Sequence, residues 1–305
     1  MTENAQPQLA DDEIDLRELF AAIWQGKWLI IAVTAVFAVA SVIYALSLPN
    51  IYKSEVLLAP VAEDSGLKIP GQLGGLAALA GVNLGSGGGD KTALALEILK
   101  SREFIGRFIE KHDLFIPVMA AEGWNRSDNS LVIDADIYDI ATKQWVREVK
   151  APFQPKPSLL ETHEELMKLI SISQDKASGM VTLAVQHYSP YLAQQWASWL
   201  VQAINDEMRK RELSEAQNSI AYLTTQLQQT NIADLRTMLF SLIEEQTKTL
   251  MLANVREEYV FKTVDPAVVA EKKAKPARAL ICILGVMLGG MLSVLIVLIR
   301  YFSKK

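Results

Sequence analysis

The sequence has few of the residues on which most catalytic and metal sites depend. Its 305 residues include one cysteine, Cys282, and three histidines, His112, His163 and His187. One cysteine excludes an intrachain disulfide, and the histidines lack the spacing of a metal-ligand set. Neither a G-x-S-x-G sequence nor a local signature of a Ser/His/Asp set is present. We therefore identify no catalytic residue, no metal site and no cofactor site, and we expect a protein that is not an enzyme.

The sequence also lacks an excess of positive charge. Its 30 Lys and Arg residues are outnumbered by 35 Asp and Glu residues, which gives a formal net charge of −5. Proteins that bind nucleic acid usually carry a strong basic balance. We therefore expect no nucleic-acid partner.

One glycine-rich sequence comes close to a phosphate-binding loop. Residues 85–92 read GSGGGDKT and differ by one residue from G-x-x-x-x-G-K-[ST]. Asp90 replaces the second glycine, so a side chain and a negative charge stand where backbone amides would surround a phosphate. No convincing strand runs directly into the loop. We interpret it as a flexible loop in which Asp90 caps the following helix.

Ionisable residues are missing from two long stretches, residues 29–48 and residues 279–299. A helix of 20 residues extends roughly 30 Å, which is the thickness of a bilayer's hydrocarbon core. Neither stretch shows the polar stripe that buried core helices usually carry. The residues before the first stretch are acidic, unlike the basic start of a signal peptide. The sequence therefore predicts two transmembrane helices.

Two spans divide the chain into a tail at 1–28, a large domain at 49–278 and a short tail at 300–305. Basic residues flank the spans on the side of both tails, at Lys27, Arg300, Lys304 and Lys305. Basic residues also precede the second span on the other side, at Lys272, Lys273, Lys275 and Arg278. The first set favours both tails in the cytoplasm, and because the positive-inside rule weakens for long translocated loops, the second set does not settle the matter.

The N-terminal tail contains an amphipathic stretch at residues 14–28. Its apolar residues follow helical spacing, and Trp24 and Trp28 stand at its end. One interpretation is a helix on the membrane surface with both tryptophans as interface anchors. The alternative is that the stretch simply begins the first span.

The large domain shows a mixture of strand and helix patterns. Residues 52–60, 169–174, 180–187 and 258–264 are predicted strands, and residues 158–167 a short helix. A glycine-rich loop is expected at 66–89. Residues 90–113 are predicted to form one helix. Its expected buried side consists of Leu94, Ile98, Phe104, Ile105, Phe108 and Ile109.

A long helical pattern follows Ser189, the predicted cap, and Pro190 in the first turn. It continues to about residue 254, with a restart near Thr230 where Asn231 is the expected cap. An unbroken helix of this length would extend roughly 90 Å, which is too long to pack on a domain of this size. It must therefore project from the base, fold back or pack against other subunits.

The second span contains a G-x-x-x-G step at Gly285 and Gly289, followed by Gly290. Small residues at this spacing allow two membrane helices to approach closely. We therefore expect this face to contact another membrane helix, although glycine is common enough in such helices for the spacing to arise by chance.

Several segments along the whole chain are shared with one known family. They are IDLRELFAAIWQGKW at 14–28, Gly74-Gly75-Leu76 to Ala80-Gly81, ALEILKSREFIGRFIEKHDL at 95–114, and, towards the C-terminus, residues 242–244, 248–253, 259–261 and 264–267. In these segments the chain resembles the Wzz-type chain-length determinants, polysaccharide co-polymerases of the Gram-negative inner membrane. Pro266 and Pro276 fit the spaced prolines of that family, whereas Ala270 and Lys273 depart from them.

The resemblance implies an α+β fold. Two transmembrane helices would flank a large periplasmic domain at 49–278, with an α/β base and a long extended helix at about 190–254. The tails at 1–28 and 300–305 would be cytoplasmic. Because no kinase domain follows the second span, the chain resembles the kinase-free type.

The resemblance also implies a function. Such proteins are homo-oligomers that regulate the modal chain length of lipid-linked O-antigen or a related glycan of lipopolysaccharide, made by a separate Wzy-type polymerase. The face formed by Gly285, Gly289 and Gly290, with Pro276 where the span begins, is then the candidate contact with the polymerase. Lipid-linked polysaccharide is a further candidate partner.

A structural adaptor of a polysaccharide export complex is the alternative function. It shares the two spans and the oligomerisation, but it predicts loss of surface delivery rather than altered glycan length. A periplasmic sensor would need an output module that the short tails do not provide, and a membrane-anchored hydrolase would need a nucleophile or a metal site.

Overall fold

The computed structural model describes residue 20, residues 23–61 and residues 87–303, without the side chains of residues 87–90. The predicted amphipathic stretch before residue 20 and most of the glycine-rich loop lie outside the described residues. The prediction that Asp90 caps the following helix is wrong, because that helix begins at Gly87, three residues earlier. The chain forms two compact units, Met1–Pro49 with Lys275–Lys305, and Asn50–Ala274.

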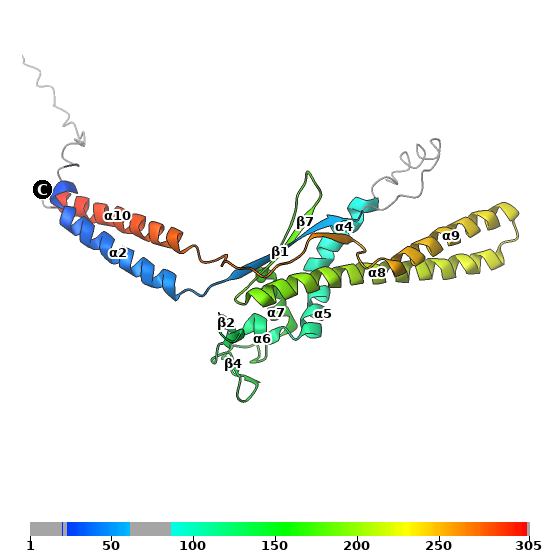
Figure 1. Ribbon diagram of the computed structural model, residues 1–305, viewed down its shortest axis with the longest axis horizontal. Coiled ribbons are helices and arrows are strands. Elements are labelled where there is room, and N and C mark those ends of the chain that lie inside the picture. Colours follow the sequence, from blue (N-terminus) through cyan, green and yellow to red (C-terminus); the bar gives the residue numbers. More distant parts are fainter. Residues whose placement is uncertain (1–19, 21–22, 62–86, 304–305) are drawn as a thin grey trace, which may run out of the picture. The chain divides into compact units, whose positions relative to one another are not determined.

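The first unit contains two helices, α2 (Lys27–Ser47) and α10 (Arg278–Phe302). Both are long and apolar enough to cross a membrane by length and composition, and little of either is buried within the structure. They pack against each other in antiparallel directions, because Gly26 lies beside Val297 while Ala45 lies beside Arg278 (Figure 1). The helices begin and end within three residues of the predicted spans at 29–48 and 279–299.

The second unit is built on a four-stranded antiparallel sheet in the order β6–β7–β1–β8. The strands are β1 (Tyr52–Pro60), β6 (Ile170–Gln174), β7 (Val181–His187) and β8 (Phe261–Asp265). All four predicted strands are confirmed, with ends displaced by three residues at most. Because β1 pairs with both β7 and β8, the first and last strands of the unit are neighbours.

Alternation along the strands puts one face of this sheet into the core. On β1 the buried residues are Ser54, Val56 and Leu58, as expected for a period of two. The helices α5 (Arg102–His112), α7 (Leu159–Leu169) and the first half of α8 (Pro190–Gln229) supply the other side of the core, with Trp196 fully buried among them. The fold is therefore α+β, as predicted.

The predicted single helix at 90–113 is wrong, because the structure has two helices. α4 (Gly87–Lys100) ends before Ser101, and α5 begins with Ser101 as its cap. The Ser101 hydroxyl accepts a hydrogen bond from the amide of Phe104 at 3.3 Å. The expected buried residues of α5 are confirmed. On α4, the expected buried residue Ile98 is confirmed, whereas Leu94 is not buried, with 49% of its surface exposed.

Between α5 and α7 the chain forms small elements away from the main sheet. α6 (Phe115–Met119) is followed by the hairpin of β2 (Ala121–Asn125) with β3 (Ser130–Ile133), and then by β4 (Tyr138–Asp139) with β5 (Gln144–Trp145). These strands resolve the part of the sequence at 131–150 whose pattern was ambiguous.

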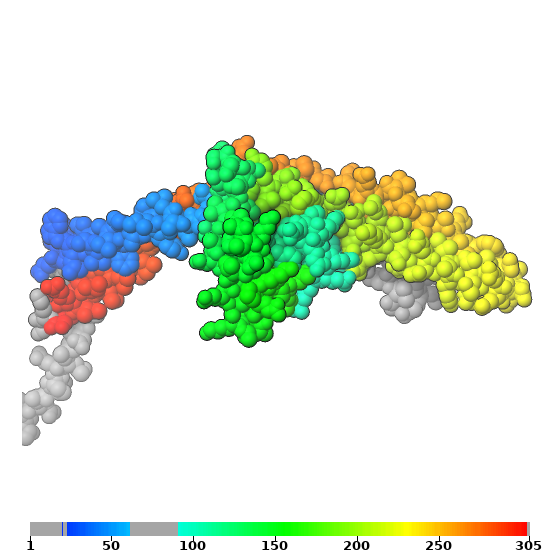
Figure 2. Space-filling model, turned by 90° about the horizontal axis from the view of Figure 1, so that it is seen from below, coloured from blue at the N-terminus to red at the C-terminus, as the bar shows by residue number. Residues whose placement is uncertain are grey.

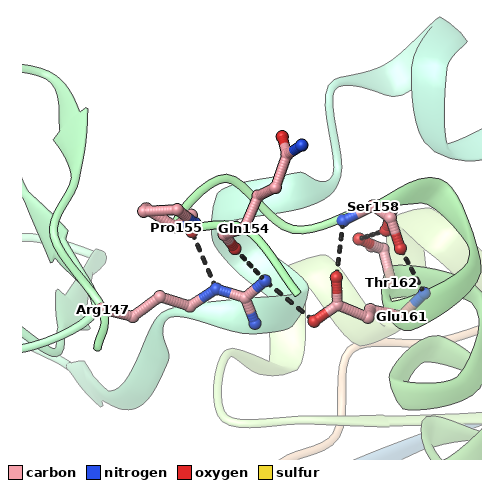
Figure 3. A network of polar contacts seen from close by, with 6 residues as sticks. All are labelled: Arg147, Gln154, Pro155, Ser158, Glu161 and Thr162. Atoms are coloured by element: carbon pink, nitrogen blue, oxygen red, sulfur yellow. Dashed lines mark hydrogen bonds and ion pairs between the residues drawn. The ribbon is translucent and has the colours of Figure 1, made fainter. Parts of the chain in front are cut away.

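An ionic network fixes the proline-containing connection that leads from these hairpins to α7 (Figure 3). The Arg147 guanidinium donates hydrogen bonds to the carbonyl oxygens of Pro155 and Gln154, at 2.7 and 2.8 Å. It also pairs with the carboxylate of Glu161 at 2.8 Å. Glu161 and Ser158 form a capping box at the start of α7. One arginine therefore ties the connection to the first turn of the helix.

The long helical pattern folds into a hairpin of two helices, α8 and α9 (Ala233–Val255). The predicted helix at about 190–254 is long, as expected, but it is not continuous, because it breaks at residues 230–232, near the predicted restart. The two helices lie side by side and run away from the strands (Figure 1). Ser189 caps α8 as predicted, whereas Ile232, not Asn231, occupies the cap position of α9. The chain therefore folds back and also projects from the base (Figure 1), and packing against other subunits stays a prediction.

One buried side chain attaches the beginning of this hairpin to its returning strand. Asn205 on α8 accepts hydrogen bonds at its Oδ1 from the amides of Tyr259, Val260 and Phe261, at 3.1, 2.9 and 3.0 Å. Its Nδ2 donates to the carbonyl oxygen of Phe261 at 3.0 Å. Asn205 is only 4% exposed. All four of these hydrogen bonds are made to the chain just before β8 or within it.

Candidate functional site

Two of the three glycines singled out in the second span lie against α2 of the same chain. A Cβ atom added to Gly289 would stand 2.6 Å from the Cβ of Phe37, and one added to Gly285 would overlap with Ser41. Both contacts are closer than real Cβ atoms allow, so the two backbones approach here because no side chain intervenes. An added Cβ on Gly290 would meet nothing within 4 Å.

Small residues continue this contact along the two helices. Ser293, one turn after Gly289, is fully buried and donates from its hydroxyl to the carbonyl oxygen of Gly290 at 2.7 Å. Further along, Gly26 meets Val297, whose Cγ1 would lie 2.5 Å from an added Cβ. The sequence argument missed Ser293 and Gly26. The four-residue spacing of 285, 289 and 293 could have indicated Ser293.

The Arg278 side chain donates hydrogen bonds to the carbonyl groups at the C-terminal end of α2. Its Nε donates to the carbonyl oxygen of Ala45 at 3.0 Å, and its Nη2 to that of Leu48 at 3.5 Å. A cation at a helix C-terminus is favourable because the last carbonyl groups have no partner within the helix. Pro276 lies two residues before it, and its carbonyl oxygen accepts from the Arg278 amide at 3.0 Å. Arg278 therefore links the ends of the two helices.

The predicted interface anchors lie near the N-terminal end of α2, Trp28 within the helix and Trp24 three residues before it. Trp24 and Trp28 expose 63% and 74% of their surfaces. The Trp24 ring stacks on Phe20 with 6.3 Å between ring centroids, and the Lys27 ammonium lies 4.8 Å from its centre. An exposed aromatic pair beside a cation suits the headgroup region, and the anchoring role stays a prediction.

The helical hairpin presents a large apolar surface that the described chain leaves uncovered. In α9 only Ala253 is buried. Its exposed apolar residues include Leu235, Met238, Phe240, Leu242, Met251, Leu252 and Val255. On the face shown in Figure 2, the green and cyan segments cover the part of α8 nearest the sheet, and the yellow tip of the hairpin stands beyond them. So many exposed large apolar side chains on one helix indicate an interaction surface.

The three histidines occupy separate places in the described fold. His187 is 2% exposed, donates from Nε2 to the carbonyl oxygen of Pro117 at 3.1 Å and accepts at Nδ1 from the Ser189 amide. Burial lowers its pKa to about 4. His112 stacks on Trp199 at 4.0 Å, and burial, followed by nearby Lys111, lowers its pKa. Among the described residues, no group of three potential ligands could hold a metal ion.

Comparison with known proteins supports the predicted family. The Wzz model, described as chain length determinant protein, matches residues 12–112. The GNVR model, a G-rich domain on tyrosine kinases, matches residues 225–302. Together the two matches cover more than half of the chain.

Individual relatives are distant. The tyrosine-protein kinase wzc of Salmonella typhimurium is 27% identical over 135 residues, which make up 41% of this chain and 18% of the kinase. The chain thus spans less than a fifth of that relative. Among solved structures, a full-length bacterial polysaccharide co-polymerase is 16% identical, with 95% of this chain and 98% of that chain covered and a TM-score of 0.39. A fragment of WzzB, a polysaccharide co-polymerase from Salmonella Typhimurium, is 14% identical, with coverage of 74% and 100% and a TM-score of 0.33. The chain therefore contains a Wzz chain length determinant domain followed by a GNVR domain, in agreement with the family that the sequence predicts.

Proposed function

We propose that this protein regulates the modal chain length of a lipid-linked surface polysaccharide, the O-antigen or a related glycan of lipopolysaccharide. It acts as a homo-oligomer beside a separate Wzy-type polymerase and forms no bond itself. The Wzz match at residues 12–112 is the observation that carries this proposal. The two apolar helices support a two-span protein of the bacterial inner membrane, with residues 49–278 in the periplasm and both tails in the cytoplasm.

The uncovered surface of α9 supports the oligomer. Met238 and Phe240 near the start of this helix expose 60% and 54% of their surfaces, although both are large and apolar. Burying such side chains would contribute about 1.5–3 kcal/mol each. Neighbouring copies of the chain, each with the same surface, would supply that burial.

The position of the glycines bears on where we propose that the polymerase binds. Gly285 and Gly289 already contact α2, so a polymerase helix would have to displace α2 to reach them. Gly290, beside open space, and the start of α10 at Pro276 stay available for that contact. We therefore place the polymerase on the remaining surface of α10.

Glycan profiling tests the function. Deleting the gene should convert a clustered distribution of glycan lengths into an unregulated one on a gel, and the gene supplied in trans should restore the cluster. An unchanged ladder would reject the proposal. Loss of surface glycan without a change in its length would instead support the adaptor of an export complex.

A charge substitution tests the oligomer separately. Met238→Glu should lower the mass of the detergent-solubilised protein measured by light scattering, because a carboxylate would have to be buried between copies. Ser241→Glu places the same charge at an exposed polar position of α9 and should leave the mass unchanged. Wild-type protein that is monomeric at high concentration would contradict the assembly.

A further inference from the structure

Three aromatic side chains from separate segments meet beside the start of α8. The Trp124 ring on β2 lies 5.7 Å from the Tyr52 ring on β1, edge to face, and 6.1 Å from the Tyr191 ring on α8. Trp124 also donates from Nε1 to the Oδ1 of Asn129 at 2.8 Å. These contacts hold Tyr191 in place from one side, while half of its surface stays exposed.

A cavity of about 580 Å³ opens next to Tyr191. This volume falls within the usual range of small-molecule sites. Its described lining contains no charged residue. The polar lining residues are Asn129, Ser189, Tyr191, Gln194 and Gln195, and the others are apolar.

The side-chain amides in this cavity offer both donors and acceptors. Asn129 uses its oxygen for Trp124, which leaves its NH₂ group as a donor. Gln194 uses its nitrogen for the carbonyl oxygen of Ala267 and for Ser198, each at 3.3 Å, which leaves its oxygen as an acceptor. Gln195 is exposed and can supply either. A hydroxyl group both donates and accepts, so this set suits a neutral polyhydroxylated ligand.

A second cavity, of about 250 Å³, differs from the first because charged residues line it. It lies between α5 and α8 and is lined by Arg107, Lys111, Asp206, Glu207 and Lys210, among others. Its Arg107 and Glu207 already form an ion pair at 3.0 Å. A ligand there would have to be charged and would compete with that pair, whereas the cavity beside Tyr191 requires neither.

We propose that the cavity beside Tyr191 binds a neutral sugar unit of the polysaccharide whose length this protein regulates. The apolar C–H face of the sugar ring packs on the Tyr191 ring, and its hydroxyl groups bond to Asn129, Gln194 and Gln195. This inference rests on the proposed function, and it adds that the glycan touches this chain directly and at one defined place. Trp124 and Tyr52 act as positioning residues for the Tyr191 ring.

Binding to purified full-length protein in detergent tests the site. The probe is the polysaccharide released by mild acid from the lipid of cells that carry this gene, and binding is measured by calorimetry. Tyr191→Ala should weaken binding about tenfold, the loss expected when an aromatic packing partner is removed. Gln195→Ala should weaken it severalfold without disturbing the fold, because Gln195 is exposed. Tyr222→Ala is the matched control, since it removes an exposed tyrosine from the same helix at a distance of roughly 46 Å along the axis.

The outcomes separate this inference from the proposed function. Equal binding by wild type and Tyr191→Ala, or no binding by wild type, overturns the site, even where deletion of the gene still disperses the glycan lengths. A deletion with no effect on length overturns the proposed function whatever the binding result. Polygalacturonate, an acidic glycan, should not compete with the probe when the ligand is neutral, and effective competition would overturn the neutral-sugar assignment.

Discussion

Replacing Asn205 by alanine should detach the helical hairpin from the strand that follows it. The change removes an acceptor shared by three consecutive backbone amides and a donor to the carbonyl oxygen of Phe261. Water cannot easily replace these bonds, because the side chain is 4% exposed. A buried group left without a partner costs about 1–3 kcal/mol. Since the three amides share one oxygen, their contributions will not add fully.

We therefore expect Asn205→Ala to lower the free energy of unfolding by about 3 kcal/mol. That is a large share of the roughly 5–15 kcal/mol that stabilises a typical domain. Urea unfolding of the detergent-solubilised protein, followed by circular dichroism, measures the change. Hydrogen exchange should also accelerate at the amides of residues 259–261, since they lose the acceptor directly.

Asn254→Ala is the matched control for this substitution. Asn254 is exposed on α9, and its Nδ2 bonds only to the carbonyl oxygen of Leu250, one turn earlier, at 3.0 Å. Its loss should change the free energy of unfolding by less than about 0.5 kcal/mol. If Asn205→Ala and Asn254→Ala have equal effects, or if exchange at 259–261 is unaltered, the role assigned to Asn205 is wrong.

Three other perturbations test separate parts of the fold. Gly289→Leu should lower the free energy of unfolding by about 1–3 kcal/mol, because it forces α2 and α10 apart, and it should lower the thermal midpoint in detergent. Gly290→Leu is the control, since Gly290 lies beside open space, and it should leave the midpoint unchanged. Equal shifts in the two variants would contradict the packing of the two helices. His187 should make stability depend on pH: its pKa is about 4 in the folded protein against 6.5 normally, so the unfolded chain takes up the proton first. The contribution of His187 to the free energy of unfolding should be constant above pH 6.5, fall by about 3 kcal/mol between pH 6.5 and 4, and level off below. His187→Gln should reduce the slope in urea titrations by that amount, and an undiminished slope would contradict the assignment to His187. Arg147→Met should free the proline-containing connection and speed its cleavage in limited proteolysis, with the exposed Arg256→Met as control; equal cleavage of the two variants would show that the network in Figure 3 does not hold the connection.

Periodic patterns allowed most helices and strands to be predicted from the sequence. The mixed apolar and polar residues at 52–60 and the cap and proline at Ser189 and Pro190 are local signals, and the strand and the helix start that they predict are confirmed. The break at Ser101 was missed because apolar residues recur at helical spacing on both sides of it. The cap of α9 was misplaced by one residue, since Ile232 occupies that position without a side-chain bond.

Contacts between distant segments could not be predicted in the same way. The G-x-x-x-G step indicates a close helix approach, but the spacing does not say which helix approaches, and Gly285 and Gly289 face α2 of the same chain. Asn205 looks like any polar residue in a helix, because its partners lie more than fifty residues later. The residues around Tyr191 come from three segments that only the folded chain brings together.

The continuity of α8 constrains how the hairpin can change in length. The same helix belongs to the core at one end and to the projecting hairpin at the other, so each inserted residue would turn everything beyond it by about 100°. Only insertions close to whole numbers of turns, such as seven residues with a matching seven in α9, would keep the two helices facing each other. Related chains with longer or shorter hairpins should therefore differ in such steps. The distance that the hairpin extends from the base would then differ between homologues in fixed steps rather than continuously.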